Sequence, residues 1–251
     1  MNHLTLFDEG FPSPGSMDTA VSHAILKSVA NKEMGESFRL HRPGPVVAFG
    51  RADRASPGYP EAVQIVEQSG FAAIERLAGG RAAVFHEQTL AFSWATPDTN
   101  PRSGIEIRFE TIANLIAEAF SELGIDSDIG ELPGEYCPGR WSLSVAGRSK
   151  VMGVGQRLIR GAAHVGGVIV IDQGYRIREV LTPVYEALGL VWNPSTVGAL
   201  TDVSPGLKVD DVATAVVESV ANRFDLEPAV IPEAVVDSAR LLMDAHLPKV
   251  A

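Results

Sequence analysis

Three consecutive segments between residues 141 and 172 have the pattern of β-strands and follow one another without a helix between them. They read WSLSVAG (141–147), SKVMGVGQRLIRG (149–161) and AAHVGGVIVID (162–172), with glycines where turns and bulges are expected. A doubly wound parallel sheet requires strands and helices to alternate along the chain. This run therefore argues against that architecture and favours a mixed or largely antiparallel sheet with helices packed on it.

Helical periodicity and further short strands complete the order helix, strands, helix, strands, helix, strands, helices. The predicted helices are 17–30 with Ser16 as N-cap, 60–70 ending at Gly70, about 105–123, one opened by Asp210 and Asp211 that runs to Phe224, and one opened by Pro232. The predicted strands are 37–43, 45–50, 71–77 and 89–95, and the predicted loops are 96–104 and 191–208. We expect one α+β domain over residues 1–251, because the later strands have no helical cover without the earlier half of the chain.

The chain is acidic and contains a single cysteine. Its 251 residues carry a net charge of −10, which disfavours general nucleic-acid binding because phosphate contacts need clustered cations. One cysteine cannot form an internal disulfide, so we expect a reducing compartment, the cytoplasm. The N-terminus lacks a basic cluster before an apolar stretch, and no apolar run approaches the ~20 residues that span a bilayer, so neither a signal peptide nor a membrane segment is expected.

The positive charges are unevenly distributed along the chain. Residues 136–171, the cationic strip, contain no Asp or Glu and carry a net charge of +5, which leaves −15 on the other 215 residues. A local cationic strip on an acidic chain indicates binding of a specific anion, such as a nucleotide phosphate, a carboxylate or an acidic carrier domain. A set of solvated strand faces is the alternative. The cations of the strip are Arg140, Arg148, Lys150, Arg157 and Arg160.

Cys137 lies within the cationic strip, in the sequence Glu-Tyr-Cys-Pro-Gly. The proline and glycine that follow it force a turn and keep the thiol out of a regular strand. Nearby cations favour the thiolate, which is the nucleophilic form of cysteine. Cys137 is therefore a candidate nucleophile, and an incidental turn cysteine is the alternative.

The segment LAGGRAAVFH (77–86) follows a predicted strand and contains two adjacent glycines. Gly79 and Gly80 allow a ligand to approach the backbone closely. The segment matches neither the P-loop nor the dinucleotide fingerprint, so a tight turn is the alternative. His86 at its end is a candidate base, with a structural histidine as the alternative.

The segment GRSKVMGVGQR (147–157) places Lys150 at the start of a strand that contains two glycines. Gly153 and Gly155 remove side chains where an elongated ligand could lie against the sheet. Lys150 could then reach a carbonyl or phosphate oxygen as a point charge, and a solvated turn lysine is the alternative. His164 in the next strand is a second candidate base, with a satisfied core histidine as the alternative.

Two common kinds of catalytic site find no motif in the sequence. It contains no His-x-x-x-His, no cysteine pair and no dense carboxylate cluster, so no metal site is expected. The Gly-x-Ser-x-Gly elbow of serine hydrolases is also missing.

Taken together, these segments resemble the lipoate–protein ligase and octanoyltransferase family, within the wider biotin/lipoate ligase fold. The likeness runs from about Met17 to Asp172, about 60% of the chain. RLHRPGPVVAFG (39–50) is similar to the family's early strand pair, and RLAGGRAAVFH (76–86) to its glycine-rich acyl-binding loop. The resemblance implies a class II synthetase-like catalytic domain, and no accessory C-terminal domain is expected in the 79 residues after Asp172.

Two shorter matches carry further family residues. Ser149–Gln156 resembles the lysine-containing strand, in which Lys150 matches the lysine that contacts the acyl carbonyl. His164-Val165-Gly166 resembles the histidine–glycine strand that follows. The substrate-binding residues implied by the resemblance are Arg76, Gly79, Gly80, Arg81, His86, Gly153, Gln156 and His164.

The segment EYCPG (135–139), followed by Ser142-Leu143-Ser144, looks most like the cysteine-dependent branch of the family. The resemblance implies that Cys137 and Lys150 are catalytic, and that Cys137 takes an octanoyl or lipoyl group as a thioester. The acyl donor would be an acyl carrier or the glycine-cleavage H protein, and the acceptors would be lipoyl domains of 2-oxoacid dehydrogenase complexes. Such a transferase requires no cofactor. We expect Lys150, or N–H groups near Gly79 and Gly80, to stabilise the oxyanion, and Lys150 to contribute little packing.

The main alternative is an ATP-dependent lipoate ligase, which would need ATP and Mg, and a second is a catalytically inactive acyl-binding homologue. Ligases of this family usually carry three glycines in the acyl loop, whereas Arg81 and Ala82 stand at the second and third positions here. Arg81 would either crowd a bound adenylate or contact its phosphate. An eight-carbon chain also needs an apolar tunnel, for which the candidate lining residues are Leu77, Val84, Val151, Val154 and Val168.

Overall fold

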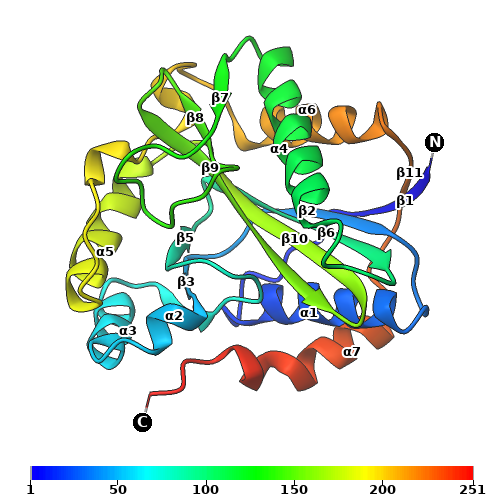
Figure 1. The fold of residues 1–251 in the computed structure, drawn as a ribbon, viewed down its shortest axis with the longest axis horizontal. Coiled ribbons are helices and arrows are strands. Elements are labelled where there is room, and N and C mark those ends of the chain that lie inside the picture. Colours follow the sequence, from blue (N-terminus) through cyan, green and yellow to red (C-terminus); the bar gives the residue numbers. More distant parts are fainter. Residues whose placement is uncertain (1, 251) are drawn as a thin grey trace.

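The computed structural model describes residues 2–250 and contains two β-sheets with helices packed around them (Figure 1). The large sheet has the strand order β11-β1-β2-β6-β10-β9-β8-β7, and the small sheet has the order β4-β3-β5. The large-sheet strands are β1 (Asn2–Phe7), β2 (Ser37–His41), β6 (Thr89–Asp98), β7 (Ser127–Ile129), β8 (Leu143–Val145), β9 (Ser149–Ile159), β10 (Gly161–Val170) and β11 (Phe224–Pro228). The small-sheet strands are β3 (Val46–Phe49), β4 (Ala72–Glu75) and β5 (Ala83–Phe85).

The large sheet is mixed but largely antiparallel, as the uninterrupted strand run predicts. Strand β1 is parallel to both β2 and β11. The other pairs of this sheet, from β2 through β6, β10, β9 and β8 to β7, are antiparallel. The segments at 141–147, 149–161 and 162–172 form β8, β9 and β10, which confirms that they are consecutive strands.

Helices cover both faces of the large sheet and the outer side of the small one (Figure 1). Helices α4 and α6 pack on one face of the large sheet and α1 on the other, α7 packs on α1, and α3 and α5 pack against the small sheet. None of the helices formed by residues 2–250 has the length and apolar character needed to cross a membrane. The helices are α1 (Met17–Ala30), α2 (Arg51–Arg54), α3 (Tyr59–Gln68), α4 (Ile105–Glu122), α5 (Gly174–Ala187), α6 (Val209–Ala221) and α7 (Glu233–Leu242), with short 3₁₀ turns η1 (Pro194–Thr196), η2 (Leu200–Asp202) and η3 (Met243–His246).

Several sequence predictions are corrected at the ends of elements. Ser16 stands at the N-cap of α1, but its hydroxyl makes no capping hydrogen bond and is buried without a partner. Phe224 does not extend helix α6, which ends at Ala221; it begins β11 instead. Strands β1 and β11 and helix α5 carry no separate prediction. The two strands pair with each other at the edge of the sheet, where β11 is short and mostly exposed. A single domain without an accessory C-terminal domain remains a prediction.

Glycines in the two central strands let neighbouring chain segments pack closely. A Cβ atom at Gly167 in β10 would lie 2.1 Å from the Gly153 carbonyl oxygen of β9 and 2.5 Å from the Phe92 ring of β6. A Cβ at Gly155 would lie 2.8 Å from the carbonyl oxygen of Gly79. The N–H of Gly79 donates a hydrogen bond to the carbonyl oxygen of Gln156 at 3.2 Å. Glycine at 155 therefore allows the loop between β4 and β5 to lie directly on β9.

Replacing Gly167 with alanine should destabilise the fold, because the new methyl group has no space between two strands. Overpacking of a buried site costs roughly 1–3 kcal/mol, which should lower the denaturant midpoint of unfolding. Gly35→Ala is the matched control, since a Cβ at Gly35 would meet nothing within 4 Å. Equal midpoints for the two variants would contradict this packing.

Candidate active site

Cys137 lies in the cysteine loop, defined as residues 130–142, which joins β7 to β8. The residue lies in a bend, as the Pro-Gly sequence after it predicts, and its side chain is half-buried. Its backbone has φ +42°, a left-handed conformation that residues other than glycine rarely adopt. Such strained positions persist only where surrounding contacts hold them, and they concentrate at functional sites.

The Cys137 sulfur faces hydrogen-bond donors of the glycine loop, defined as residues 76–82. The backbone N–H of Arg81 donates to Sγ at 3.2 Å, and Nη1 of Arg76 lies 3.5 Å from Sγ. Donors and a guanidinium in these positions favour a negative charge on sulfur. A Cβ at Gly80 would lie only 2.8 Å from Sγ, and Gly80 has φ +116°, so glycine is required where this loop passes the thiol.

Lys150 is buried and holds the cysteine loop, so the expectation that it contributes little packing is wrong. Its side chain is 1% exposed and pairs with the fully buried carboxylate of Glu135 at 2.9 Å. Its Nζ also donates to the carbonyl oxygens of Tyr136 and Cys137, each at 2.9 Å. The three N–H donors of the ammonium group thus have three partners on the loop that carries the thiol. The side chain is buried because β9 runs directly beneath the cysteine loop.

Glu135 fixes the loop from its other side. Its two carboxylate oxygens accept hydrogen bonds from the N–H groups of Leu132 at 3.1 Å and Gly139 at 3.0 Å. The Ser142 hydroxyl donates to Oε1 at 2.6 Å. Together with Lys150, these contacts bind the carboxylate to both ends of the loop.

Tyr185 of helix α5 bridges the cysteine loop and the glycine loop. Its hydroxyl accepts a hydrogen bond from the Cys137 N–H at 2.9 Å and donates to the Ala82 carbonyl oxygen at 3.1 Å. Burial raises the pKa of Tyr185 well above its usual value, so the hydroxyl keeps the proton that it donates. One phenol therefore fixes the relative position of the thiol and the loop that faces it.

Arg81 points toward helix α2. Its guanidinium pairs with the buried carboxylate of Asp53 at 3.2 Å, and that carboxylate also accepts the Gly50 N–H at 2.8 Å. Burial raises the pKa of Asp53, while the Gly50 and Arg81 hydrogen bonds act in the opposite direction. The Arg81 side chain thus anchors the glycine loop to α2, while its backbone N–H faces the thiol.

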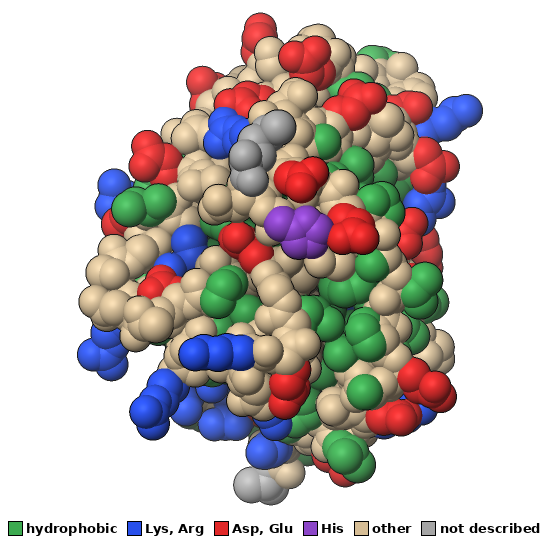
Figure 2. Space-filling view, turned by 90° about the vertical axis from the view of Figure 1, so that its right-hand side faces the viewer, with side chains coloured by type: hydrophobic (Ala, Val, Ile, Leu, Met, Phe, Trp, Pro, Cys, Tyr) green, Lys and Arg blue, Asp and Glu red, His purple; other side chains and the backbone are tan. Residues whose placement is uncertain are grey.

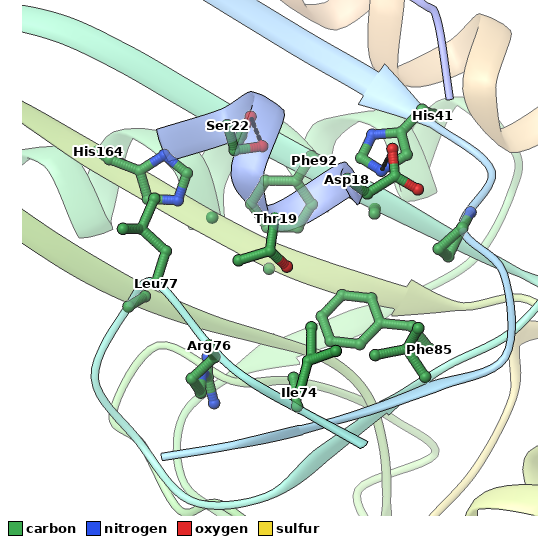
Figure 3. A pocket seen from close by; sticks show the side chains of 18 of the residues that line it. Asp18, Thr19, Ser22, His41, Ile74, Arg76, Leu77, Phe85, Phe92 and His164 are labelled. Carbon is green, nitrogen blue, oxygen red and sulfur yellow. Dashed lines mark hydrogen bonds and ion pairs between the residues drawn. The ribbon is translucent and has the colours of Figure 1, made fainter. Parts of the chain in front are cut away.

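An apolar pocket lies between the two sheets beside this loop (Figure 3). It encloses about 640 Å³ including open solvent. Arg76 lines the pocket and also contacts the thiol, so one side chain links the two, although Cys137 is not among the lining residues. Its apolar lining residues include Val46, Ala48, Ile74, Leu77, Phe85 and Phe92.

The residues that line the pocket differ in part from those predicted to line the acyl tunnel. Leu77 lines the pocket as expected. The other four candidates, Val84, Val151, Val154 and Val168, do not line it; the first three belong to or pack on hydrophobic clusters, and Val168 is buried. Their alternation along strands carried no information about which side of the sheet faces a ligand.

The structure brings only one of the two candidate histidines to the pocket. His164 lines it, and its Nδ1 is buried without a hydrogen-bond partner. His86 is fully buried in the turn before β6, where its Nδ1 accepts the Gln88 N–H, and it is not among the lining residues. Burial lowers the pKa of His164 to about 3 and that of His86 to about 4, so both rings are neutral at pH 7 and are weak bases.

Gly153 and Gln156 support the site without facing the apolar pocket. A Cβ at Gly153 would lie 3.3 Å from Cε of Lys150, so this glycine leaves space for the lysine side chain. The Gln156 side chain bonds Arg108 and the Ile105 carbonyl oxygen of helix α4. The backbone carbonyl of Gln156 holds the glycine loop through Gly79.

The predicted cationic strip does not form one surface. Lys150 is buried, and Arg140 forms an exposed ion pair with Glu106 of α4 at 3.3 Å. Arg148 and Arg160 flank opposite ends of β9, whose 11 residues span roughly 35 Å at about 3.3 Å per residue. Residues that are close in the sequence therefore separate along an extended strand.

Sequence reasoning missed three side chains that shape the site. Glu135 stands two residues before Cys137 in the sequence, but no pattern in the sequence indicates that its carboxylate pairs with Lys150. Asp53 and Tyr185 lie far from Cys137 in the chain, and no local pattern indicates their contacts with the two loops. Among residues 2–250, no group of three or more His, Cys, Asp or Glu side chains is placed to hold a metal ion.

Comparisons with known proteins identify the family. A family model described as the lipoyl protein ligase A/B catalytic domain matches residues 15–221. An octanoyl-GcvH:protein N-octanoyltransferase of Geobacillus kaustophilus is 32% identical over 168 residues, which are 66% of this chain and 59% of that relative. One of Oceanobacillus iheyensis is 27% identical over 237 residues, 90% of this chain and 84% of that relative. The chain thus spans about three fifths of the length of the Geobacillus relative.

Solved structures show the same fold. A crystal structure of lipoate-protein ligase A bound with ATP superimposes with a TM-score of 0.77 and covers 97% of this chain and 95% of that chain, at 20% sequence identity. This likeness confirms the expected lipoate ligase fold, with its mixed sheet flanked by helices. Since the family model covers most of the sequence, the chain belongs to the lipoyl protein ligase A/B catalytic domain family.

Proposed function

We propose that this chain is an acyltransferase that moves an octanoyl or lipoyl group onto the target lysine of lipoyl domains through a thioester on Cys137. The observation that carries the proposal is a strained cysteine whose sulfur faces Arg76 and the Arg81 N–H beside an apolar pocket. The activity in the names of the curated relatives supports it. The lone thiol must stay reduced, which fits the cytoplasm.

The first step forms the thioester. The Cys137 thiol gives its proton to the donor's thiol or amine, and the resulting thiolate attacks the acyl carbonyl; the new C–S bond forms and the bond from the acyl carbon to the protonated donor group breaks. The Arg81 N–H and Arg76 replace Lys150 as the oxyanion donors in this proposal, because the three donors of Lys150 already have partners. The apolar pocket holds the chain, at ~0.8 kcal/mol for each buried CH₂.

The second step transfers the acyl group. A neutral lysine amine of the acceptor attacks the thioester, the C–N bond forms, and Cys137 leaves as thiolate while the amine loses a proton. His164 lines the pocket and His86 does not, but burial makes both rings weak bases, so we assign this proton to the Cys137 thiolate as it leaves. The partner supported by the names of the relatives is the glycine-cleavage H protein; an acyl carrier donor and the lipoyl domains of 2-oxoacid dehydrogenases are further partners in the proposal.

The ATP-dependent alternative fits the residues less well. The Lys150 ammonium is committed to Glu135 and two loop carbonyls, so it offers no donor to a phosphate in this arrangement. Arg81, at a position where ligases usually carry glycine, is paired with Asp53. We therefore propose that the transferase needs no ATP, no Mg and no other cofactor.

Incubation with an octanoyl-loaded carrier should add one octanoyl mass to Cys137, because the thiolate takes the acyl group as a thioester. Hydroxylamine should remove this mass, and ATP should not be required. Intact-mass spectrometry checks both.

Cys137→Ala should lower transfer by at least about 10³-fold, as removal of a nucleophile does. Full transfer by this variant, or AMP release during acylation, would sink the transferase proposal in favour of a ligase.

Lys150→Ala should unfold more easily than the wild type, because it leaves the Glu135 carboxylate buried without its partner. Removing one member of a buried pair costs roughly 3–5 kcal/mol. Glu135→Gln combined with Lys150→Met should recover most of this loss in denaturant unfolding. Acylation of Cys137 should nevertheless stay slow, since nothing then holds the Tyr136 and Cys137 carbonyls. Wild-type acylation by the double variant would show that the pair serves folding alone.

Tyr185→Phe should slow acylation of Cys137 by about tenfold, because it leaves the Cys137 N–H and the Ala82 carbonyl unpaired, at roughly 1–3 kcal/mol for each buried group. Well below the unfolding temperature, alkylation of the folded variant by iodoacetamide should also slow, which a purely structural role would not cause. Tyr175→Phe on the same helix is the control, since Tyr175 is half exposed. Identical alkylation rates in both variants would contradict a positioning role.

A further inference from the structure

A second pocket opens beside the thiol and is lined by arginines. It encloses about 1090 Å³ including open solvent, larger than the apolar pocket. Its arginines come from helix α2, the glycine loop and strand β9, and its far wall includes His246 of the C-terminal turn η3. The four are Arg51, Arg54, Arg76 and Arg157. We call it the arginine groove.

The groove carries positive charge that the protein does not neutralise. Its one carboxylate is Glu75, which pairs with Arg54 at 2.9 Å. Within residues 2–250, Arg51 and Arg157 are exposed and take part in none of the ion pairs found. Burial, together with the neighbouring His246, Lys27 and Arg157, lowers the pKa of His23 to about 4, so the charge of Arg157 acts on the space that His23 lines.

This charge is local, since the chain as a whole has a net charge of −10. Figure 2 shows the face at the right of Figure 1, on the side away from helix α2, and acidic side chains are spread widely over it. An anionic partner is therefore repelled by much of the surface and attracted where arginines cluster without acidic neighbours.

The groove and the apolar pocket share residues of the glycine loop, one of which contacts the thiol, although Cys137 itself lines neither. Arg76, Leu77 and Ala78 line both the groove and the apolar pocket, and Nη1 of Arg76 lies 3.5 Å from Cys137 Sγ. A partner seated on the groove would thus hold a flexible acyl-bearing or amine-bearing side chain next to the sulfur.

We infer that the arginine groove docks an acidic protein surface that flanks the acyl-bearing or acceptor lysine of the carrier. Exposed guanidinium groups on helix α2 and strand β9 suit several carboxylates on one protein face better than a single phosphate. The inference rests on the proposed function and names where its protein substrate binds. It also replaces the cationic strip, of which only Arg157 lines the groove.

The test compares two octanoyl donors, the octanoyl-loaded glycine-cleavage H protein and the small thioester octanoyl-N-acetylcysteamine. For each we would measure the second-order rate constant of Cys137 acylation by mass spectrometry. The ratio of the protein constant to the small-thioester constant should fall about tenfold or more in Arg51→Glu and in Arg157→Glu. The rate with the protein donor should also depend less steeply on salt in these variants.

Arg148→Glu is the matched control, because Arg148 is exposed, lies at the opposite end of β9 and changes the net charge equally. Its ratio should stay within about twofold of wild type, since steering acts only over a Debye length of ~8 Å. An equal fall in Arg148→Glu would show that net charge governs encounter and would overturn the inference. Unchanged ratios in Arg51→Glu and Arg157→Glu would overturn it too. If neither donor acylates Cys137 in the wild type, the proposed function itself fails.

Discussion

The buried ion pair between Glu135 and Lys150 is the interaction on which the rest of the site depends. Transfer of two charges from water into a protein interior costs several kcal/mol for each ion, and attraction offsets this only when the remaining hydrogen-bonding capacity is also satisfied. Here it is satisfied by the cysteine loop itself, through two carbonyls that accept from Lys150 and two N–H groups that donate to Glu135. The loop conformation, including the strained backbone of Cys137, is therefore the one in which both charges are stable.

The sequence was most informative where a pattern repeats along one element. Apolar spacing predicted the bounds of α1 and nearly those of α4, and the strand run predicted the centre of the sheet. Strands β1 and β11 were missed because the apolar alternation of each, Leu4 and Leu6 in one and Phe224 and Leu226 in the other, covers too few residues to distinguish a strand from a loop. Phe224 was misassigned for a related reason, since one apolar residue in helical register also fits the first position of a strand.

At the site, the Pro-Gly turn predicted the conformation around Cys137, and the glycine pair indicated a close backbone approach. The roles of Lys150 and Arg81 could not be derived in the same way, because each depends on a carboxylate that the fold supplies from elsewhere. The prediction that the cationic strip forms one surface was wrong for a different reason. An extended strand carries charges that are adjacent in sequence to opposite ends of the sheet, while Arg51 and Arg157, far apart in sequence, meet in one groove.

The close approach of Gly80 to the sulfur has a consequence for chemical probes of this enzyme family. Because even a single carbon atom at Gly80 would lie 2.8 Å from Sγ, the side of the thiol that faces the glycine loop is closed to any reagent. An electrophile must therefore approach Cys137 from a side that the glycine loop leaves open. The shape of the reagent, more than its intrinsic reactivity, should decide which covalent inhibitors label Cys137.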